Sequence, residues 1–123
     1  MEHTYEILKD KKLIIEKYLG SFSPGDLEDS IVVMLKDPDF DKSYDGIVDF
    51  TAAKLTLKSS DVDQLVQFMK GQDKVTNGRR AIIASDSAIT AFSFIYKIKS
   101  TTLHRIEIFS TYDAAYRWLG ISK

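Results

Sequence analysis

The chain has 123 residues and a formal net charge of −1, with 44% hydrophobic and 28% charged residues, which fits one globular domain and argues against a disordered chain. It contains no cysteine, which excludes disulfides, thiolate nucleophiles and cysteine-ligated zinc, and no apolar run approaches the roughly 18 residues of a membrane span. We therefore expect a cytoplasmic protein without a membrane span.

Two β-rich runs open the chain and predict a hairpin. Thr4 to Lys9 and Leu13 to Leu19 are separated by three residues, which implies an antiparallel pair. Ser23-Pro24-Gly25-Asp26 then predicts a helix start, because serine caps a helix well and proline at its first position loses no needed N–H. The apolar residues of this helix follow at helical spacing: Leu27, Ile31, Met34 and Leu35. Asp37-Pro38 ends it.

The middle of the chain reads as strand, helix and strand. Gly46 to Phe50 predicts a buried strand, and Ser59 or Ser60 can cap the helix that follows, with Asp63 completing a capping box with Ser60. The helix keeps its apolar spacing through four residues: Val62, Leu65, Val66 and Met69. It is expected to stop at Gly71, before a turn at Asn77-Gly78 and a strand from Arg80 to Ser85.

The predicted third helix, Ala88 to Lys99, is apolar almost all round. Thr90, Ser93 and Lys97 form one narrow polar stripe, and a helix of this kind must bury more than one face. Another element of the domain, a second subunit or an apolar ligand would cover it. The residues of this candidate interface or ligand surface are Phe92, Phe94, Ile95, Tyr96 and Ile98.

The chain closes with a strand and a short helix. Arg105 to Phe109 alternates as a strand does, and Ser110 with Asp113 forms a second capping box before a helix that Gly120 stops. The predicted order is therefore ββαβαβαβα. Strands and helices alternate from the third strand onward, which implies right-handed parallel crossovers and a mixed α/β sheet, with the N-terminal hairpin as its antiparallel part.

Read end to end, the sequence resembles the SpoIIAA-like group, small bacterial STAS-like proteins also described as STAS/SEC14 domain proteins. Four runs carry the resemblance: Gly20 to Ser23 with Asp26, Tyr44 to Phe50, Gly78 to Ile83, and Phe109 to Ala115 continuing to Trp118-Leu119. The resemblance implies a single STAS-like domain over residues 1–123, with helices packed on a mixed sheet. Members of the group are largely uncharacterised.

In anti-sigma factor antagonists of similar fold, a serine at the start of the second helix is phosphorylated to release a partner. The resemblance places Ser59 at that position, with Ser60 beside it, but Lys58 and Asp61 replace the acid and the glycine of the switch motif. A phosphate there would gain from the helix N-terminus and from Lys58, while Asp61 and Asp63 would repel it. The two serines are thus a candidate phosphorylation site or, alternatively, plain helix caps.

Asp49 and Thr51 are candidate ligand-binding residues at the edge of the predicted sheet. They follow a strand core at the carboxyl end of a predicted parallel strand, where open α/β sheets bind ligands. The alternative is that Asp49 satisfies backbone N–H groups of the loop that follows.

No catalytic constellation, cofactor fingerprint or metal site is expected. His3 and His104 have no second histidine at metal-ligand spacing, and the aspartates of residues 37–45 lack the glycine and glutamate of an EF-hand loop. The basic residues Lys70, Lys74, Arg79 and Arg80 cluster without interleaved aromatics, so nucleic-acid binding is not expected.

Two functions remain. The first is a non-enzymatic STAS-like interaction module in bacterial regulation, acting on a protein partner or on a second copy of itself as a homodimer. The second is a carrier or sensor of an apolar small molecule or lipid that uses the surface near residues 88–99.

Overall fold

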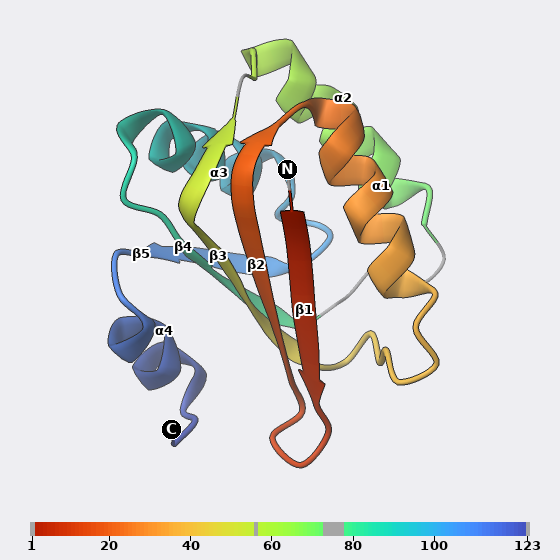
Figure 1. Cartoon of the computed structure of the whole chain (residues 1–123), viewed down its shortest axis with the longest axis vertical. Coiled ribbons are helices and arrows are strands. Elements are labelled where there is room, and N and C mark those ends of the chain that lie inside the picture. The colour runs from red at the N-terminus through yellow and green to blue at the C-terminus, as the bar shows by residue number, and fades with distance from the viewer. Residues whose placement is uncertain (1, 56, 73–77, 123) are drawn as a thin grey trace.

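The computed structural model describes residues 2–55, 57–72 and 78–122, with the backbone alone of Ser59. Nine elements follow the expected ββαβαβαβα order (Figure 1). They are β1 (Glu2–Leu8), β2 (Leu13–Phe22), α1 (Pro24–Leu35), β3 (Asp45–Leu55), α2 (Ser59–Lys70), β4 (Arg79–Ile83), α3 (Ser87–Lys99), β5 (Arg105–Phe109) and α4 (Tyr112–Leu119). No helix within the described ranges is long and apolar enough to cross a membrane.

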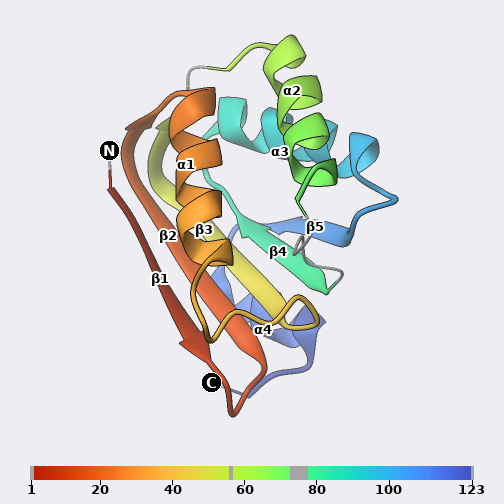
Figure 2. The ribbon, with the colours of Figure 1, turned by 90° about the vertical axis from the view of Figure 1, so that its right-hand side faces the viewer.

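The five strands form one sheet in the order in which they occur along the chain. β1 pairs antiparallel with β2, as the hairpin prediction requires, and β2 to β5 are parallel. Each crossover moves one strand in the same direction. Because right-handed crossovers that advance in one direction put their helices on one face, α1, α2 and α3 share a face, and α4 covers the other (Figures 1 and 2).

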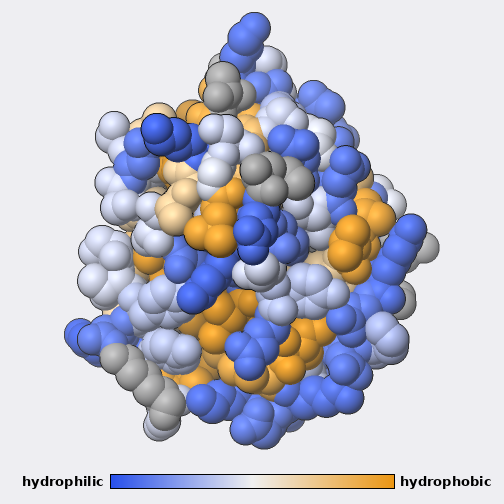
Figure 3. Space-filling model, viewed as in Figure 1, coloured by the Kyte–Doolittle hydropathy of each residue, from blue (hydrophilic) through white to orange (hydrophobic). Residues whose placement is uncertain are grey.

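Two hydrophobic cores result, one on each face of the sheet. The larger core joins the sheet to α1, α2 and α3 through residues such as Phe50, Val66 and Ile82. The smaller core joins the sheet to α4 through Ala81 and Leu119 among others. The face drawn in Figure 3 shows hydrophobic side chains between hydrophilic ones over the strands beside α4, and a separate hydrophobic group over α1.

Several helix ends follow their sequence signals. Ser23 accepts from the N–H of Asp26, whose carboxylate in turn accepts from the N–H of Ser23, so the predicted capping box of α1 is present. Gly71 follows the last residue of α2, and Gly120 ends α4 with a positive φ of 68°. Glycine adopts that left-handed conformation at no steric cost.

Two predicted caps are wrong by one or two residues. Lys58 occupies the N-cap of α2, and its N–H donates to the Asp61 carboxylate at 2.7 Å, so Ser59 and Ser60 lie in the first turn and do not cap it. Asp63 does not complete a box with Ser60 but forms an ion pair with Lys99 of α3. At α4 the cap is Thr111, not Ser110, because the Thr111 hydroxyl reaches the N–H of Ala114.

β3 is longer than the predicted strand. After Phe50 it continues to Leu55, paired with the second half of β2 from Ala52 opposite Leu19 to Leu55 opposite Phe22. A register shift between Lys17 and Leu19 precedes this stretch. The pairing of β3 with β4 ends earlier, where Asp49 lies opposite Ile83.

Asp49 holds α4 to the sheet. Its carboxylate accepts from the N–H and the hydroxyl of Thr51 and, at 2.7 Å, from the hydroxyl of Tyr112 in α4. Burial opposes the charged form, but these hydrogen bonds outweigh it and lower the pKa of Asp49. Burial and the bond to Asp49 raise the pKa of Tyr112 above its ordinary range.

We predict that Tyr112→Phe lowers the free energy of unfolding by about 1 to 2 kcal/mol, because a hydrogen bond to a charged group is lost. Since the pKa of Asp49 is lowered on folding, its stabilisation is present above the ordinary pKa of an aspartate and is lost as pH falls through the folded value. Urea unfolding of wild type and variant from pH 7 to pH 3 measures both effects, and the variant should lose less stability on acidification.

Tyr116→Phe is the matched control, because Tyr116 lies one turn further along α4 and its hydroxyl makes no hydrogen bond within the described ranges. We expect it to change stability by less than about 0.5 kcal/mol. Equal losses in the two variants would show that the Tyr112–Asp49 bond contributes nothing particular.

Candidate functional site

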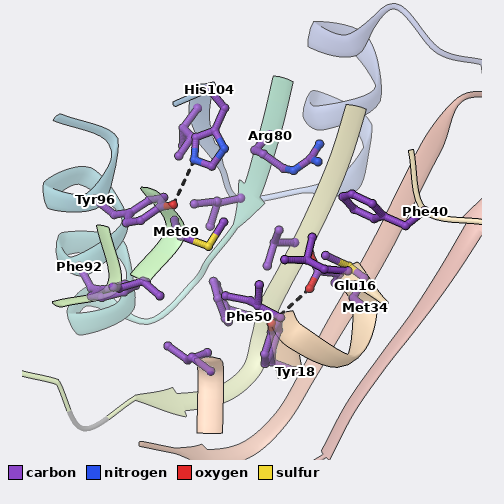
Figure 4. A pocket seen from close by; sticks show the side chains of 17 residues that line it. Glu16, Tyr18, Met34, Phe40, Phe50, Met69, Arg80, Phe92, Tyr96 and His104 are labelled. Carbon is purple, nitrogen blue, oxygen red and sulfur yellow. Dashed lines mark hydrogen bonds between the residues drawn. The ribbon is translucent and has the colours of Figure 1, made fainter. Parts of the chain in front are cut away.

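A cavity lies between the sheet and helices α1, α2 and α3 (Figure 4). Its volume is about 100 Å³. The hollow as a whole, including the part open to solvent, holds about 730 Å³ of space free of atoms. Of the seventeen described residues that line it, twelve are apolar: Leu27, Ile31, Met34, Leu35, Phe40, Val48, Phe50, Leu65, Met69, Ile82, Phe92 and Ile106. The other five are Glu16, Tyr18, Arg80, Tyr96 and His104.

Strand alternation brings charged residues into this cavity. Successive side chains of a strand point to opposite faces of the sheet, so Arg80 and Ile82 of β4 face the helices while Ala81 and Ile83 face α4. In the same way Glu16 and Tyr18 of β2 line the cavity. The sheet therefore places one cation and one carboxylate among apolar walls.

The Arg80 side chain extends across β3 because Gly46 makes room for it. Gly46 lies opposite Arg80 in the parallel pairing, and a Cβ built at Gly46 would lie 2.7 Å from Nη1 of Arg80 and 3.0 Å from its Cδ. Figure 4 shows the guanidinium directed toward the side of the cavity where Phe40 lies. Nη1 donates to the backbone carbonyls of Tyr44 at 2.9 Å and Arg79 at 3.0 Å, which fixes the guanidinium in place.

The guanidinium of Arg80 is a buried charge without a counter-ion in contact among the described residues. The residue is 6% exposed, and burial lowers its pKa to about 10, with Glu16 and Asp45 opposing that shift from a distance. Arg80 is thus still charged at neutral pH. Within the described ranges no carboxylate forms an ion pair with it, and its Nη2 atom is buried with no hydrogen-bond partner.

The remaining polar groups of the cavity are bonded to one another or to neighbours. Oε1 of Glu16 lies 3.0 Å from Nε2 of His3 and accepts from the Tyr18 hydroxyl at 3.2 Å. The Tyr96 hydroxyl lies 3.1 Å from Nε2 of His104 (Figure 4). Burial raises the pKa of both tyrosines, so their hydroxyls stay protonated.

Helix α3 divides the predicted surface residues into two groups. Tyr96 is 8% exposed and, with the partly buried Phe92, lines the cavity, while Ile95 packs against the same core. Phe94 and Ile98 point outward and are 48% and 71% exposed. Ser93 of the predicted polar stripe is fully buried, and its hydroxyl donates to the Ile89 carbonyl.

The other predicted site residues lie away from the cavity. Asp49 and Thr51 bond to each other, and Asp49 faces α4 on the opposite side of the sheet. Ser60 is exposed at the start of α2, and the side chain of Ser59 lies outside the described residues.

The basic cluster does not form a continuous surface. Arg80 is buried, Arg79 forms an ion pair with Asp45 and donates to carbonyls at the end of α4, and Lys74 lies outside the described residues. Among the described residues there is no group of three or more histidine, aspartate or glutamate side chains that could hold a metal ion.

Sequence reasoning did not identify Arg80 or Glu16 as cavity residues. The available signal was a charged side chain at an inward position of an apolar strand: Glu16 within LIIEKYL and Arg80 within RAIIAS. Such a side chain is rarely buried unless it is paired or functional.

Comparison with known proteins supports the fold. No protein-family model matches the chain, and no curated protein matches it either. Among solved structures it is similar to an uncharacterized protein of the DUF3478 family with a SpoIIAA-like fold from Shewanella loihica PV-4. The TM-score is 0.62 at 17% sequence identity, over 96% of this chain and 92% of that one. The chain therefore has the SpoIIAA-like mixed α/β fold that the sequence resemblance implied.

We predict that Gly46→Ala acts through Arg80. The added Cβ displaces the guanidinium from its two carbonyl acceptors. The substitution should therefore lower the free energy of unfolding by about 1 to 2 kcal/mol in the wild-type protein, and by much less in the Arg80→Met variant. A double-mutant cycle by urea unfolding measures a coupling of about 1 kcal/mol. Gly25→Ala, whose Cβ would meet only Ser23 Oγ at 3.9 Å, is the control. If the effects of Gly46→Ala and Arg80→Met on the free energy of unfolding simply add, the contact between the two residues contributes nothing and the prediction is wrong.

Proposed function

We propose that this chain binds a small, largely apolar molecule in the cavity between its sheet and helices α1 to α3, as a carrier or sensor of that molecule. The observation that carries the proposal is the cavity itself, about 100 Å³ with twelve apolar lining residues. Ligand sites in proteins are concave and mostly apolar, with a few convergent polar groups. Arg80, Glu16 and His104 supply such polar groups here.

The energetics of packing favour a molecule bound in the cavity. Protein interiors are packed with few voids larger than a water molecule, and atoms that line a void lose dispersion contacts. An apolar molecule in this cavity regains those contacts and removes its own surface from water. A ligand that binds only the folded chain also stabilises it by mass action.

Binding without catalysis is the simpler account of the polar groups. A catalytic acid, base or nucleophile must face substrate, yet Glu16 already accepts from Tyr18 and lies against His3, and Tyr96 lies against His104. A cytoplasmic location belongs to the same proposal, since a chain without cysteine suits a reducing compartment.

Filling the cavity should abolish binding. Ile31 of α1 lines the cavity, whereas Val33 on the same helix is 60% exposed and does not. We expect Ile31→Trp to weaken binding of N-phenyl-1-naphthylamine, a neutral apolar dye, by at least about tenfold relative to wild type, and Val33→Trp to leave it unchanged. A fluorescence titration measures the dissociation constants, and thermal unfolding confirms that both variants fold. Equal binding by all three proteins would place the dye outside the cavity and contradict the proposal.

A second candidate function is self-association through the outer face of α3, as a protein-interaction module. Ala91, Phe94 and Ile98 are exposed on that face, and two large apolar side chains one turn apart resemble the centre of a helix-pairing surface. A second copy would pair its own α3 there around a twofold axis.

For this interface we predict that Phe94→Glu converts a dimer to a monomer in sedimentation velocity at micromolar concentration, because a carboxylate at the centre of an apolar interface is desolvated without a partner. Val33→Glu, at an exposed apolar position on α1, should leave the dimer intact. A wild-type protein that is monomeric at that concentration would contradict self-association through α3.

A further inference from the structure

We propose that the molecule bound in this cavity carries a carboxylate and that Arg80 binds that carboxylate. The inference rests on the proposed function, because it specifies the chemistry of the ligand in the same cavity. It starts from a single atom: Nη2 of Arg80, a buried donor on a charged group to which no described residue offers an acceptor.

Burying an unpaired donor of this kind costs free energy of folding. Buried polar groups in native proteins are hydrogen-bonded in the great majority, and leaving a donor of a charged group unsatisfied costs more than leaving a neutral one. The carbonyls of Tyr44 and Arg79 satisfy Nη1 of the same guanidinium, so the side chain is already held in place for a partner at Nη2. An anion from outside the chain supplies both the missing acceptor and the missing counter-charge.

The charges around the cavity favour a single negative charge on that ligand. Among the described residues that line the cavity Arg80 is the only lysine or arginine, and Glu16 lines the same cavity. A dianionic phosphate would meet one guanidinium and a carboxylate of its own sign, whereas a carboxylate matches one guanidinium, often through two parallel hydrogen bonds. Glu16 does not replace the ligand, because it lies outside ion-pair distance of Arg80 and accepts from Tyr18.

The apolar walls define the rest of the ligand. Met34 of α1, Met69 of α2 and Phe92 of α3 line the cavity together with apolar residues of the sheet. Methionine side chains adapt to irregular apolar shapes, so they tolerate a flexible chain. The ligand class is therefore a monocarboxylate with an apolar tail, such as a medium-chain fatty acid.

Three probes with one tail separate the head group from the tail. Decanoate, decanol and decylamine are titrated into the full chain by calorimetry at pH 7. Decanol is kept below its solubility limit, and decanoate and decylamine below the concentrations at which they form micelles. We expect decanoate to bind at least about tenfold more tightly than decanol, because a charge-assisted hydrogen bond forms in a desolvated site, and decylamine to bind most weakly.

Substitutions test whether Arg80 causes the preference for decanoate over decanol. Arg80→Met keeps the length of the apolar stem without the charge and should bring the dissociation constants of decanoate and decanol to within about threefold of each other. Arg117→Met, an exposed arginine on α4 at the opposite face, should keep the full preference and is the matched control. If Arg80→Met fails to fold, Glu16→Gln gives an independent test. It removes a like charge and should strengthen decanoate binding while leaving decanol binding unchanged.

The outcomes distinguish this inference from the function on which it rests. Equal binding of decanoate and decanol in wild type would overturn the carboxylate assignment, with water as the partner of Nη2, and would leave the apolar site intact. Tighter binding of decylamine would overturn it in favour of Glu16 as the head-group partner. If none of the three probes binds, the proposed function itself fails.

Discussion

Right-handed crossovers leave little freedom in how this chain covers its sheet. Strands β2 to β5 follow one another in space as in sequence, so α1, α2 and α3 must all lie on one face. The other face would be exposed without α4, which the Tyr112–Asp49 hydrogen bond holds in place. Three helices over one face enclose more volume than their side chains fill, and the cavity lies there.

The pairing of Arg80 with Gly46 explains how the sheet places a charged group in the cavity. The parallel pairing of β3 with β4 sets the two residues side by side, and the missing Cβ of Gly46 is what lets a guanidinium lie across the sheet inside an apolar layer. Taking an unpaired charge out of water is costly, and replacing such a charge by an apolar side chain often stabilises a protein. That cost is the physical reason for our proposal that Arg80 binds an anion.

Local signals in the sequence were sufficient for the elements and their order. The serine-proline start of α1, the glycine after α4 and the alternation of strands with helices each act within a few residues. The cavity could not be predicted in this way, because Arg80 meets Gly46 and the carbonyl of Tyr44 across more than thirty residues of chain.

The cap of α2 was missed for a local reason. The carboxylate of Asp61 accepts from the N–H of Lys58, so a lysine occupies the position where a serine was expected. On α3, helical periodicity indicated an apolar surface, but only packing shows that Tyr96 faces the cavity and Ile98 the solvent.

The most direct test of the central claim, that the cavity under α1 to α3 is a binding site, is a methyl-selective NMR titration of the isoleucine-labelled protein with decanol. The sheet provides matched reporters: Ile82 and Ile106 line the cavity, and Ile47 and Ile83 lie in the core on the opposite face. We predict saturable shifts of the Ile82 and Ile106 methyl signals with little change at Ile47 and Ile83. Shifts confined to Ile98 on the outer face of α3, or equal at all four buried isoleucines, would contradict the account.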